Sequence, residues 1–336
     1  MKKQIVVGIL GATGAVGDEM RLVLQQRGLP VEMRLFASQR SDGKRMLFNG
    51  EEVLVQAVNE NSFTGCDYVL GAVNASLSKK YAPFIKRAGA VYIDNSSAFR
   101  LAEDVPLVVP QINGEDAFYH SGIVANPNCV TIIGLMAVAA IEREAGISRI
   151  VASSYQAVSG AGAGGIAELK AQERELYCAG GSASAQVFAH KIVRNLIPQI
   201  GEVGKDGISS EENKLVYEGR KILHRGSDLK ISCCCVRVPV LRSHCISICL
   251  ETKRRITAKR AQEVIAAFPG CILLDEPAKQ RYPMPLYATG QDSVLVGRVR
   301  EDAVFDNGLS LFCCADQLRK GAAANAVDIL QLLAAI

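Results

Sequence analysis

No apolar run in this chain of 336 residues reaches the length that a membrane-spanning helix needs. Met1-Lys2-Lys3 leads directly into a strand pattern with no cleavage site after it, so we expect no signal peptide. The sequence also lacks internal repeats, low-complexity segments and a clear linker. What remains is an ordinary globular composition, 49% hydrophobic and 21% charged, with enough length for two domains and no sign of a membrane partner.

A strong excess of charge is also missing. The formal net charge is +4, and Lys and Arg are not clustered as a nucleic-acid surface would require. We therefore expect no nucleic-acid partner. A mildly basic balance suits a protein that handles anionic small molecules.

The 11 cysteines show no zinc-site or disulfide spacing, and their number is odd. Cys233-Cys234-Cys235 and Cys313-Cys314 lie in apolar segments, where we expect small core residues. Neighbouring cysteines on a strand point to opposite faces and rarely pair. The pattern indicates a reducing, cytoplasmic setting and no metal site.

The N-terminal segment carries a glycine motif in an informative place. A buried strand pattern over 4–10 is followed by Gly11-Ala12-Thr13-Gly14-Ala15-Val16-Gly17 and then by a helix pattern from Asp18 to about Arg27. Glycines at such a turn allow a pyrophosphate to approach the backbone at a helix N-terminus. The order of strand, glycine turn and helix therefore predicts dinucleotide binding, with a merely structural turn as the alternative.

The end of the second expected strand, 31–37, indicates which dinucleotide binds. NAD sites usually carry an acidic residue there for the ribose 2′-OH. Here Arg40 and Lys44 are cationic, and Ser38 and Ser41 are hydrogen-bond donors, which suits the 2′-phosphate of NADP. A solvated basic loop is the alternative, and Asp42 leaves NAD open.

Strands and helices then alternate, which predicts a parallel, doubly wound sheet of the α/β class. Ligands bind beyond the carboxyl ends of such strands, where Asn74, Ser96, Ser97 and Arg100 fall. Arg100 could bind an anion or simply be a surface residue. The expected strands are 67–73, 90–94, 108–113 and 123–125, with a helix over about 77–88.

Cys129 follows Asn126-Pro127-Asn128 and precedes an apolar run, 132–141, that predicts a helix. A cysteine at a helix N-terminus gains thiolate character, and the thiolate is the nucleophile. A small buried cysteine is the alternative.

The second half of the chain changes in pattern. We expect strands over 149–158, 231–251 (one or two antiparallel strands), 292–299 and 309–316, and helices over 166–177, 209–223 and 321–336. Glu211 and Lys214 share a helix face, as a solvated ion pair or as a site. Arg237 and His244 lie in apolar surroundings, where His244 could be a general base or a hydrogen-bonded structural residue.

Six motifs in order resemble the aspartate-semialdehyde dehydrogenase family along nearly the whole chain. They are Gly11 to Gly17, Asn126-Pro127-Asn128-Cys129, Tyr155-Gln156-Ala157-Val158-Ser159-Gly160, Glu211-x-x-Lys214, Arg237-Val238-Pro239-Val240 with His244, and Leu318-Arg319-Lys320-Gly321-Ala322-Ala323-x-Asn325-Ala326. The sequence departs from the family at Val130, where Ser or Thr is usual, and at Gln317, where Asn is common.

The resemblance implies residue roles. Cys129 would be the acylated nucleophile, His244 the acid/base, and Gln156 the residue that orients the intermediate and contacts the substrate. Arg237 would hold the substrate α-carboxylate and Glu211 its ammonium group. Arg100 and Lys214 would bind phosphate. The cofactor NADP would contact Gly11, Thr13, Gly14, Ala15, Val16, Arg40, Ser41, Ser159, Gly160 and Gln317.

The resemblance also implies an architecture and a reaction. We expect a Rossmann domain over 1–129, rejoined by the C-terminal helix 316–336, and an α+β domain over 130–315 with a largely antiparallel sheet that binds substrate and forms a homodimer. The reaction would be the reversible, NADP-dependent reductive dephosphorylation of L-4-aspartyl phosphate to L-aspartate 4-semialdehyde, which serves lysine/diaminopimelate, threonine and methionine biosynthesis. The rivals are N-acetyl-γ-glutamyl-phosphate reductase, which usually has Asn-Pro-Gly-Cys at the nucleophile, and a non-catalytic NADP-binding sensor or redox protein.

Overall fold

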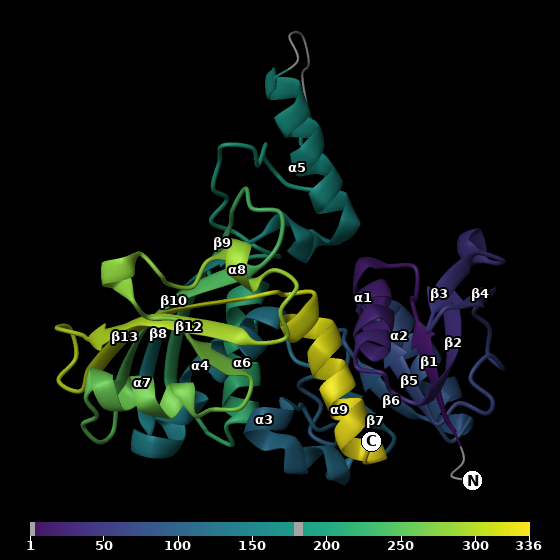
Figure 1. The fold of residues 1–336 in the computed structure, drawn as a ribbon, viewed down its shortest axis with the longest axis horizontal. Helices are drawn as coiled ribbons and strands as arrows, with labels where there is room; N and C mark the ends of the chain where they lie inside the picture. The colour runs from purple at the N-terminus through teal and green to yellow at the C-terminus, as the bar shows by residue number, and fades with distance from the viewer. Residues whose placement is uncertain (1–3, 178–183) are drawn as a thin grey trace. The chain divides into compact units, whose positions relative to one another are not determined.

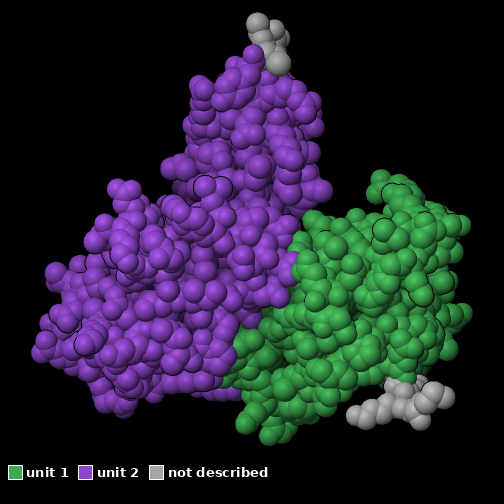
Figure 2. Space-filling view, in the orientation of Figure 1, with its two compact units in different colours: residues 1–128, 322–336 green, residues 129–321 purple. Residues whose placement is uncertain are grey.

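The computed structural model describes residues 4–177 and 184–336. It divides the chain into two compact units, which we call unit 1 (residues 1–128 and 322–336) and unit 2 (residues 129–321), coloured separately in Figure 2. Within the described ranges, no helix combines the length and apolar character needed to cross a membrane.

Unit 1 contains a seven-stranded sheet in the order β3-β4-β2-β1-β5-β6-β7. Its strands are β1 (Ile5–Leu10), β2 (Val31–Ala37), β3 (Arg45–Phe48), β4 (Glu51–Ala57), β5 (Tyr68–Gly71), β6 (Val91–Asp94) and β7 (Ile123–Ala125). All neighbours are parallel except β3 and β4. The strand order reverses direction between β1 and β5, so the predicted doubly wound parallel sheet is confirmed, with an antiparallel edge that the sequence pattern had not indicated.

The helices of unit 1 are α1 (Ala15–Gln26), α2 (Ala75–Arg87), the four-residue α3 (Pro110–Asn113) and α9 (Ala324–Ala334). The last helix contributes fully buried Val327, Ile329 and Leu330 to the core that also holds Val7 and Ile93. It lies against α1 and β6 (Figure 1). The C-terminus of the chain therefore completes the core of its first unit.

Buried amides tie α9 to the sheet of unit 1. Asn325 donates from Nδ2 to Oδ1 of Asn126 at 2.7 Å and to the carbonyl of Val108 at 3.0 Å. Asn126 in turn donates to Oδ1 of Asn95 at 2.6 Å. Buried polar groups are usually hydrogen-bonded, and each of these three amides makes at least one such bond, although Oδ1 of Asn325 has no partner among the described residues.

The strand expected over 108–113 is wrong. Leu107 makes only an isolated bridge to Ala125, and the chain then turns into α3 at Pro110, which has no N–H to give to a strand ladder. The Asn113 side chain accepts from the Val109 N–H at 2.9 Å and donates to the Leu107 carbonyl at 2.9 Å. These side-chain bonds replace the pairing that a strand would have made.

Unit 2 contains a six-stranded mixed sheet in the order β11-β12-β13-β10-β8-β9. Its strands are β8 (Ile147–Gln156), β9 (Lys230–Arg237), β10 (His244–Thr252), β11 (Cys271–Leu273), β12 (Val294–Glu301) and β13 (Gly308–Ala315). The β8–β9 and β11–β12 pairs are parallel, and the other three are antiparallel. The predicted largely antiparallel sheet is confirmed.

The two strands expected within 231–251 are β9 and β10, and they do not pair with each other. β8 lies between them, in parallel register with β9 and antiparallel register with β10. Gln156 at the end of β8 is therefore the register partner of Arg237, and Tyr155 is the partner of Cys245, next to His244. The inserted strand brings three predicted site residues to one end of the sheet.

The helices of unit 2 are α4 (Cys129–Ala145), α5 (Gly162–Tyr177), α6 (Ser210–Ile222), α7 (Ala258–Ala266) and the short α8 (Pro285–Ala288). α4 is buried along most of its length because it contacts β10, β12 and β13 on one side and α6 and α7 on others. That environment explains why its sequence is a nearly continuous apolar run. α5 projects away from the sheet (Figure 1).

The cysteine runs follow strand alternation. Cys235, Cys313 and Cys314 are buried as expected, but Cys234 is exposed, because adjacent residues of β9 point to opposite faces. Cys245 and Cys314 face each other across β10 and β13, and their sulfurs lie 3.3 Å apart. Cys178 lies outside the described residues.

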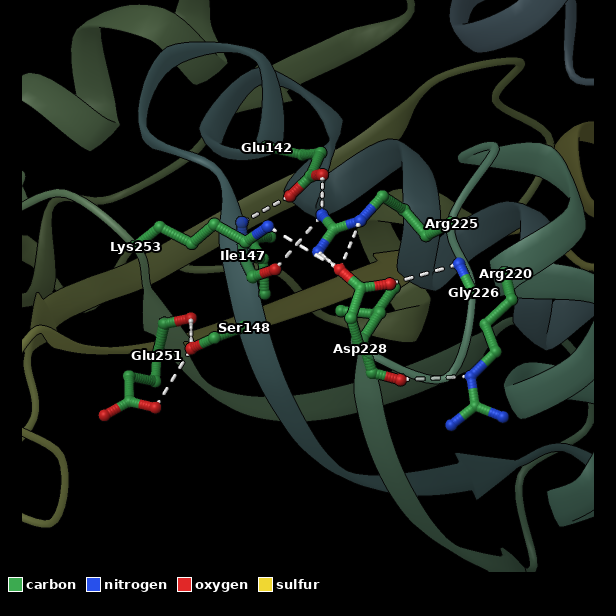
Figure 3. Close-up of polar contacts among 10 residues, drawn as sticks. Glu142, Ile147, Ser148, Arg220, Arg225, Gly226, Asp228, Glu251 and Lys253 are labelled. Carbon is green, nitrogen blue, oxygen red and sulfur yellow. Dashed lines mark hydrogen bonds and ion pairs between the residues drawn. The ribbon is translucent and has the colours of Figure 1, made fainter.

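An ionic network joins the end of α4 to the segment before β9 (Figure 3). Arg225 donates from Nη1 to Oε1 of Glu142 at 2.5 Å and to the carbonyl of Ile147 at 3.2 Å. Its Nε donates to Oδ2 of Asp228 at 3.1 Å. This hydrogen bond from Arg225 is the main reason that the pKa of the exposed Asp228 is lowered to about 2.

Candidate active site

Cys129 is the first residue of α4 and is half-buried. Its position at a helix N-terminus favours the thiolate, as the sequence predicted. The backbone of Gly321 packs directly on it: a Cβ built on Gly321 would lie 2.9 Å from the Cβ of Cys129. The electrostatic interaction with Cys129 also favours the charged form of Arg237, which links the two residues within unit 2.

His244 is the first residue of β10 and is fully buried. Its Nδ1 accepts from the backbone N–H of Ala157 at 3.1 Å, while Nε2 has no hydrogen-bond partner among the described residues. Burial, and then the positive charge of Arg237, lower the pKa of His244 to about 3. The ring is therefore neutral near pH 7, and the bond at Nδ1 assigns its proton to Nε2.

Arg237 is the last residue of β9 and is buried. Its Nη1 donates to the Ala157 carbonyl at 2.8 Å, and its guanidinium lies 5.9 Å from the centre of the Phe188 ring. Burial lowers the pKa of Arg237 from its usual high value, but an arginine stays charged at neutral pH. A buried guanidinium is suited to binding a carboxylate.

One glycine lies against both of these side chains. A Cβ built on Gly160 would lie 2.6 Å from Nη1 of Arg237 and 3.2 Å from Nε2 of His244. Gly160 belongs to the helical turn Val158–Ala161, directly after Ala157, which bonds to both residues through its backbone. The turn therefore contacts the histidine and the arginine together, and it does so without a side chain at position 160.

Gln156, Glu211 and Lys214 form a connected polar group. Gln156 is buried and donates from Nε2 to Oγ of Ser154 at 3.2 Å and to Oε1 of Glu211 at 3.4 Å. The other oxygen of Glu211 accepts from Nζ of Lys214 at 2.8 Å. The ion pair expected from the helix spacing is thus formed, but Glu211 is buried and joined to Gln156, so the pair is not a simple solvated one.

Gln317 and Ser159, both expected to line the cofactor, bond to each other. Nε2 of Gln317 donates to Oγ of Ser159, and Oε1 accepts from the backbone N–H of Ser243 at 2.7 Å. Sequence reasoning missed Ser243 and Ala157 as site residues. The only signal was their position, because each adjoins a residue that was singled out, His244 or Gln156.

The glycine turn in unit 1 fits a dinucleotide. Gly11 has φ +90°, and a Cβ on it would lie 2.5 Å from the Ala72 carbonyl oxygen. A Cβ on Gly17 would lie 2.3 Å from the Gly11 carbonyl oxygen, so both positions require glycine. α1 begins with Ala15 and Val16. Gly14, which precedes them, has no side chain that could cap the N–H groups at the start of the helix. A pyrophosphate is the kind of group that such a helix start binds.

The predicted cofactor residues Thr13, Arg40 and Ser41 also lie in unit 1, whereas Ser159, Gly160 and Gln317 belong to unit 2. Ser41 is buried and shares a hydrogen bond of 3.2 Å with the hydroxyl of Thr13. Arg40 is exposed on the short turn Gln39–Ser41, which follows β2. The carboxylate of Asp42 accepts from the backbone N–H of Ala57 at 2.7 Å.

The remaining strand-end residues of unit 1 make local bonds. Arg100 is buried and donates from Nη2 to the carbonyl of Asn95 at 2.8 Å. Asn74 caps α2 by accepting from the Leu77 N–H at 3.0 Å, and Ser96 donates to Asp94 at 2.7 Å. The phosphate-binding role of Arg100 and Lys214 stays a prediction. Among the described residues, no group of three or more His, Cys, Asp or Glu is placed to hold a metal ion.

A dinucleotide-type glycine turn in one unit and a helix-terminal cysteine with a buried arginine and neutral histidine in the other define a semialdehyde dehydrogenase-type oxidoreductase. Comparison with known families agrees. Residues 6–119 match the semialdehyde dehydrogenase NAD binding domain, and residues 138–320 match the semialdehyde dehydrogenase dimerisation domain.

Full-length relatives specify the family. The aspartate-semialdehyde dehydrogenase of Aquifex aeolicus is 49% identical over 97% of both chains, and that of a Synechocystis species is 46% identical over 99% of this chain and 98% of its own. Aspartate semialdehyde dehydrogenase II of Vibrio cholerae, solved in complex with ASA, superposes with a TM-score of 0.96 at 41% identity over 99% of each chain. The chain belongs to the aspartate-semialdehyde dehydrogenase family, and the resemblance of the motifs is confirmed.

Proposed function

We propose that this enzyme catalyses the reversible, NADP-dependent reductive dephosphorylation of L-4-aspartyl phosphate to L-aspartate 4-semialdehyde through a thioester on Cys129. The observation that carries the proposal is the turn at Gly160. It lies against the guanidinium of Arg237 and against the imidazole of His244, whose buried Nε2 has no hydrogen-bond partner in the part of the chain that the structure describes. Arg237, the proposed carboxylate ligand, and His244, the proposed acid/base, therefore share one neighbouring turn, and this shared neighbour supports the proposal.

The residues divide the chemistry as follows. The Cys129 thiolate attacks the acyl carbon, the S–C bond forms as the C–O bond to phosphate breaks, and phosphate leaves with the bonding electron pair. Bound NADPH would supply the hydride that reduces the thioester. The Nε2–H of His244, in its acid/base role, donates to the oxyanion that hydride addition creates; as the C=O bond re-forms, the C–S bond breaks, the aldehyde and the Cys129 thiolate are released, and any proton shared with that oxygen returns to Nε2.

Substrate charges match the side chains of unit 2. Arg237 would bind the α-carboxylate and Glu211 the ammonium group, while Gln156, bonded to Glu211, would orient the acyl group. Lys214, which pairs with Glu211 at 2.8 Å, and Arg100 are the proposed phosphate ligands. An N-acetylated substrate has no ammonium group, so a buried Glu211 argues for the free amino acid.

NADP is the proposed cofactor because the end of β2 offers cations and hydroxyls. Arg40 is exposed there, and Thr13 and Ser41 adjoin through their hydroxyls. Asp42 is the acidic residue that would suit the ribose 2′-OH of NAD, and one of its carboxylate oxygens accepts from the backbone N–H of Ala57. Positively charged and hydroxyl groups favour a 2′-phosphate over a free 2′-OH.

We also propose a homodimer formed through unit 2. The helices α4, α6 and α7 contact the sheet, while β8 leaves Val151 and Tyr155 47% and 39% exposed on alternate residues of one face. The ring of Phe312 on β13 lies 6.4 Å from that of Tyr155 and extends the apolar surface. Exposed apolar side chains gathered on one face of a sheet are typical of an interface between copies. The dimerisation domain to which residues 138–320 belong has this role in its name.

The test follows NADPH absorbance while purified enzyme oxidises L-aspartate 4-semialdehyde with NADP, with and without inorganic phosphate. Phosphate-dependent NADPH formation supports both the substrate and the acyl phosphate product. Turnover only with N-acetyl-L-glutamate 5-semialdehyde would identify the rival reductase, and NADP binding without turnover of either aldehyde would identify a sensor. Cys129→Ser should lose most activity and still bind NADP, because the glycine turn is unchanged; retained turnover would refute the nucleophile.

A further inference from the structure

The residue before His244 has an unusual backbone. Ser243 has φ +78°, in the left-handed region that residues other than glycine seldom adopt, and it is buried. Such a conformation persists only where the surroundings hold it. Because His244 follows directly, the φ of Ser243 decides where the imidazole is aimed.

Side chains beyond the end of β13 hold this residue. The β10–β13 ladder stops at the pair His244 and Ala315. The side chains of the next two residues, Asp316 and Gln317, bond to the segment that precedes His244. Oδ2 of Asp316 accepts from Nε of Arg242 at 2.7 Å. Oε1 of Gln317 accepts from the backbone N–H of Ser243 at 2.7 Å. The left-handed residue is thus bonded at its own backbone N–H.

The side-chain amide of Gln317 also contacts the segment that hydrogen-bonds to the His244 ring. Nε2 of Gln317 donates to Oγ of Ser159, in the turn that directly follows Ala157. Ala157 donates to Nδ1 of His244 at 3.1 Å. One glutamine therefore connects the segment that precedes His244 with the segment that fixes its ring, and it is itself only 3% exposed.

We propose that Gln317 is a positioning residue for His244, whose amide bridges Ser243 and the Ser159 turn and so fixes the tautomer and direction of the imidazole. The inference rests on the proposed acid/base role of His244. It differs from a direct cofactor contact, because the amide oxygen and one amide hydrogen are already bonded within the protein.

The test uses Gln317→Met, which keeps the length and volume of the side chain and removes both hydrogen bonds. We expect kcat to fall about 10- to 100-fold, as displacement of a reacting group by a fraction of an ångström to about 1 Å would produce, with the KM for NADP within about 2-fold of wild type. A rise of about 10-fold or more in that KM, with or without a fall in kcat, overturns the proposal in favour of a cofactor contact. Unchanged kcat also overturns it.

Gln262→Met is the matched control. Gln262 lies on α7, is partly buried and donates one hydrogen bond of 2.9 Å to Asp275, so the same substitution there removes a comparable bond. Its kcat should stay within about 2-fold of wild type, since only a displaced reacting group carries the larger cost. An equal loss in both variants would mean a general effect on folding and would overturn the proposal.

Two further measurements keep the proposal testable if Gln317→Met is poorly folded. Gln317→Asn is about 1.5 Å shorter, cannot span both bonds, and should show the same split between kcat and KM. Adding Ser243→Gly to either variant should recover part of the lost kcat, because glycine adopts a positive φ without the steric cost. No recovery in the double variant would overturn the role of Ser243.

The state of the ring can be read without turnover. Long-range proton–nitrogen NMR of histidine-labelled protein, assigned with His244→Gln, should show a neutral ring protonated at Nε2 in the wild type and mixed tautomers in Gln317→Met. An unchanged His244 signal overturns the proposal. If the wild type shows the expected ring but no phosphate-dependent activity, the proposed function has failed and the positioning role has not.

Discussion

Replacing Gly160 by alanine should damage the active site while leaving the fold intact. The new Cβ would lie 2.6 Å from Nη1 of Arg237 and 3.2 Å from Nε2 of His244. A comfortable contact is about 3.5 Å, so the guanidinium must retreat by about 0.9 Å and the imidazole by about 0.3 Å. The first displacement is large enough to break the 2.8 Å bond from Arg237 to Ala157.

The size of the effect follows from these displacements. Misplacing an active-site group by about 1 Å costs about 100-fold, so kcat/KM for L-aspartate 4-semialdehyde should fall by about that factor. The assay is the phosphate-dependent formation of NADPH at several aldehyde concentrations. Because Arg237 is the proposed carboxylate ligand, a good part of the loss should appear in the KM for the aldehyde.

Gly164→Ala is the matched control in the same glycine-rich segment. Among the described residues, its Cβ would approach Cγ2 of Val187, a half-exposed side chain, at 3.3 Å, and alanine favours the helix that contains it. This variant should keep kcat/KM within about 2-fold, as no reacting group is displaced. Near-normal activity of Gly160→Ala, or an equal loss in Gly164→Ala, would refute the geometric reasoning.

Three further predictions concern stability and the nucleophile. The pKa of His244 is about 3 in the folded protein against the usual 6.5, so the unfolded chain binds the proton more readily. The contribution of His244 to the free energy of unfolding is therefore fully present above pH 6.5, and it falls by up to about 1.4 kcal/mol per pH unit toward pH 3. His244→Gln should flatten that slope in urea unfolding between neutral and mildly acidic pH, and an unchanged slope would contradict the low pKa. Arg225→Met removes the charged hydrogen bond to Glu142 and should lower the free energy of unfolding by about 2 kcal/mol with kcat unchanged, whereas an unchanged urea midpoint would show that the network is not stabilising. Gly321→Ala pushes against Cys129 and should slow its alkylation by iodoacetamide, and a wild-type alkylation rate would disprove that contact.

The sequence predicted features that depend on neighbouring residues. A strand, a glycine turn and a helix are local signals, and β1 and α1 formed around Gly11 and Gly17 as expected. The helix after Cys129 was equally clear, because its apolar run and its start signals agree. The predicted last helix, 321–336, begins one turn later, after a π-helical turn over Arg319–Ala323.

Features that depend on distant residues were not predictable. The insertion of β8 between β9 and β10 sets Gln156 beside Arg237, and no periodicity carries that information. The positive φ of Ser243 is imposed by its surroundings, since serine has no preference for it. The strand expected at 108–113 failed because Pro110 has no N–H for a strand ladder and because the side chain of Asn113 makes local hydrogen bonds instead.

The return of α9 to unit 1 has a consequence for the order of synthesis. The strands of that unit lie within residues 5–125, but Val327, Ile329 and Leu330 of its core are translated only after unit 2. A ribosome-bound chain therefore carries an incomplete first unit, with an uncovered apolar surface, while all of unit 2 is being made. Folding of unit 1 as a complete domain before unit 2 is closed to this protein, because part of its core follows unit 2 in the chain.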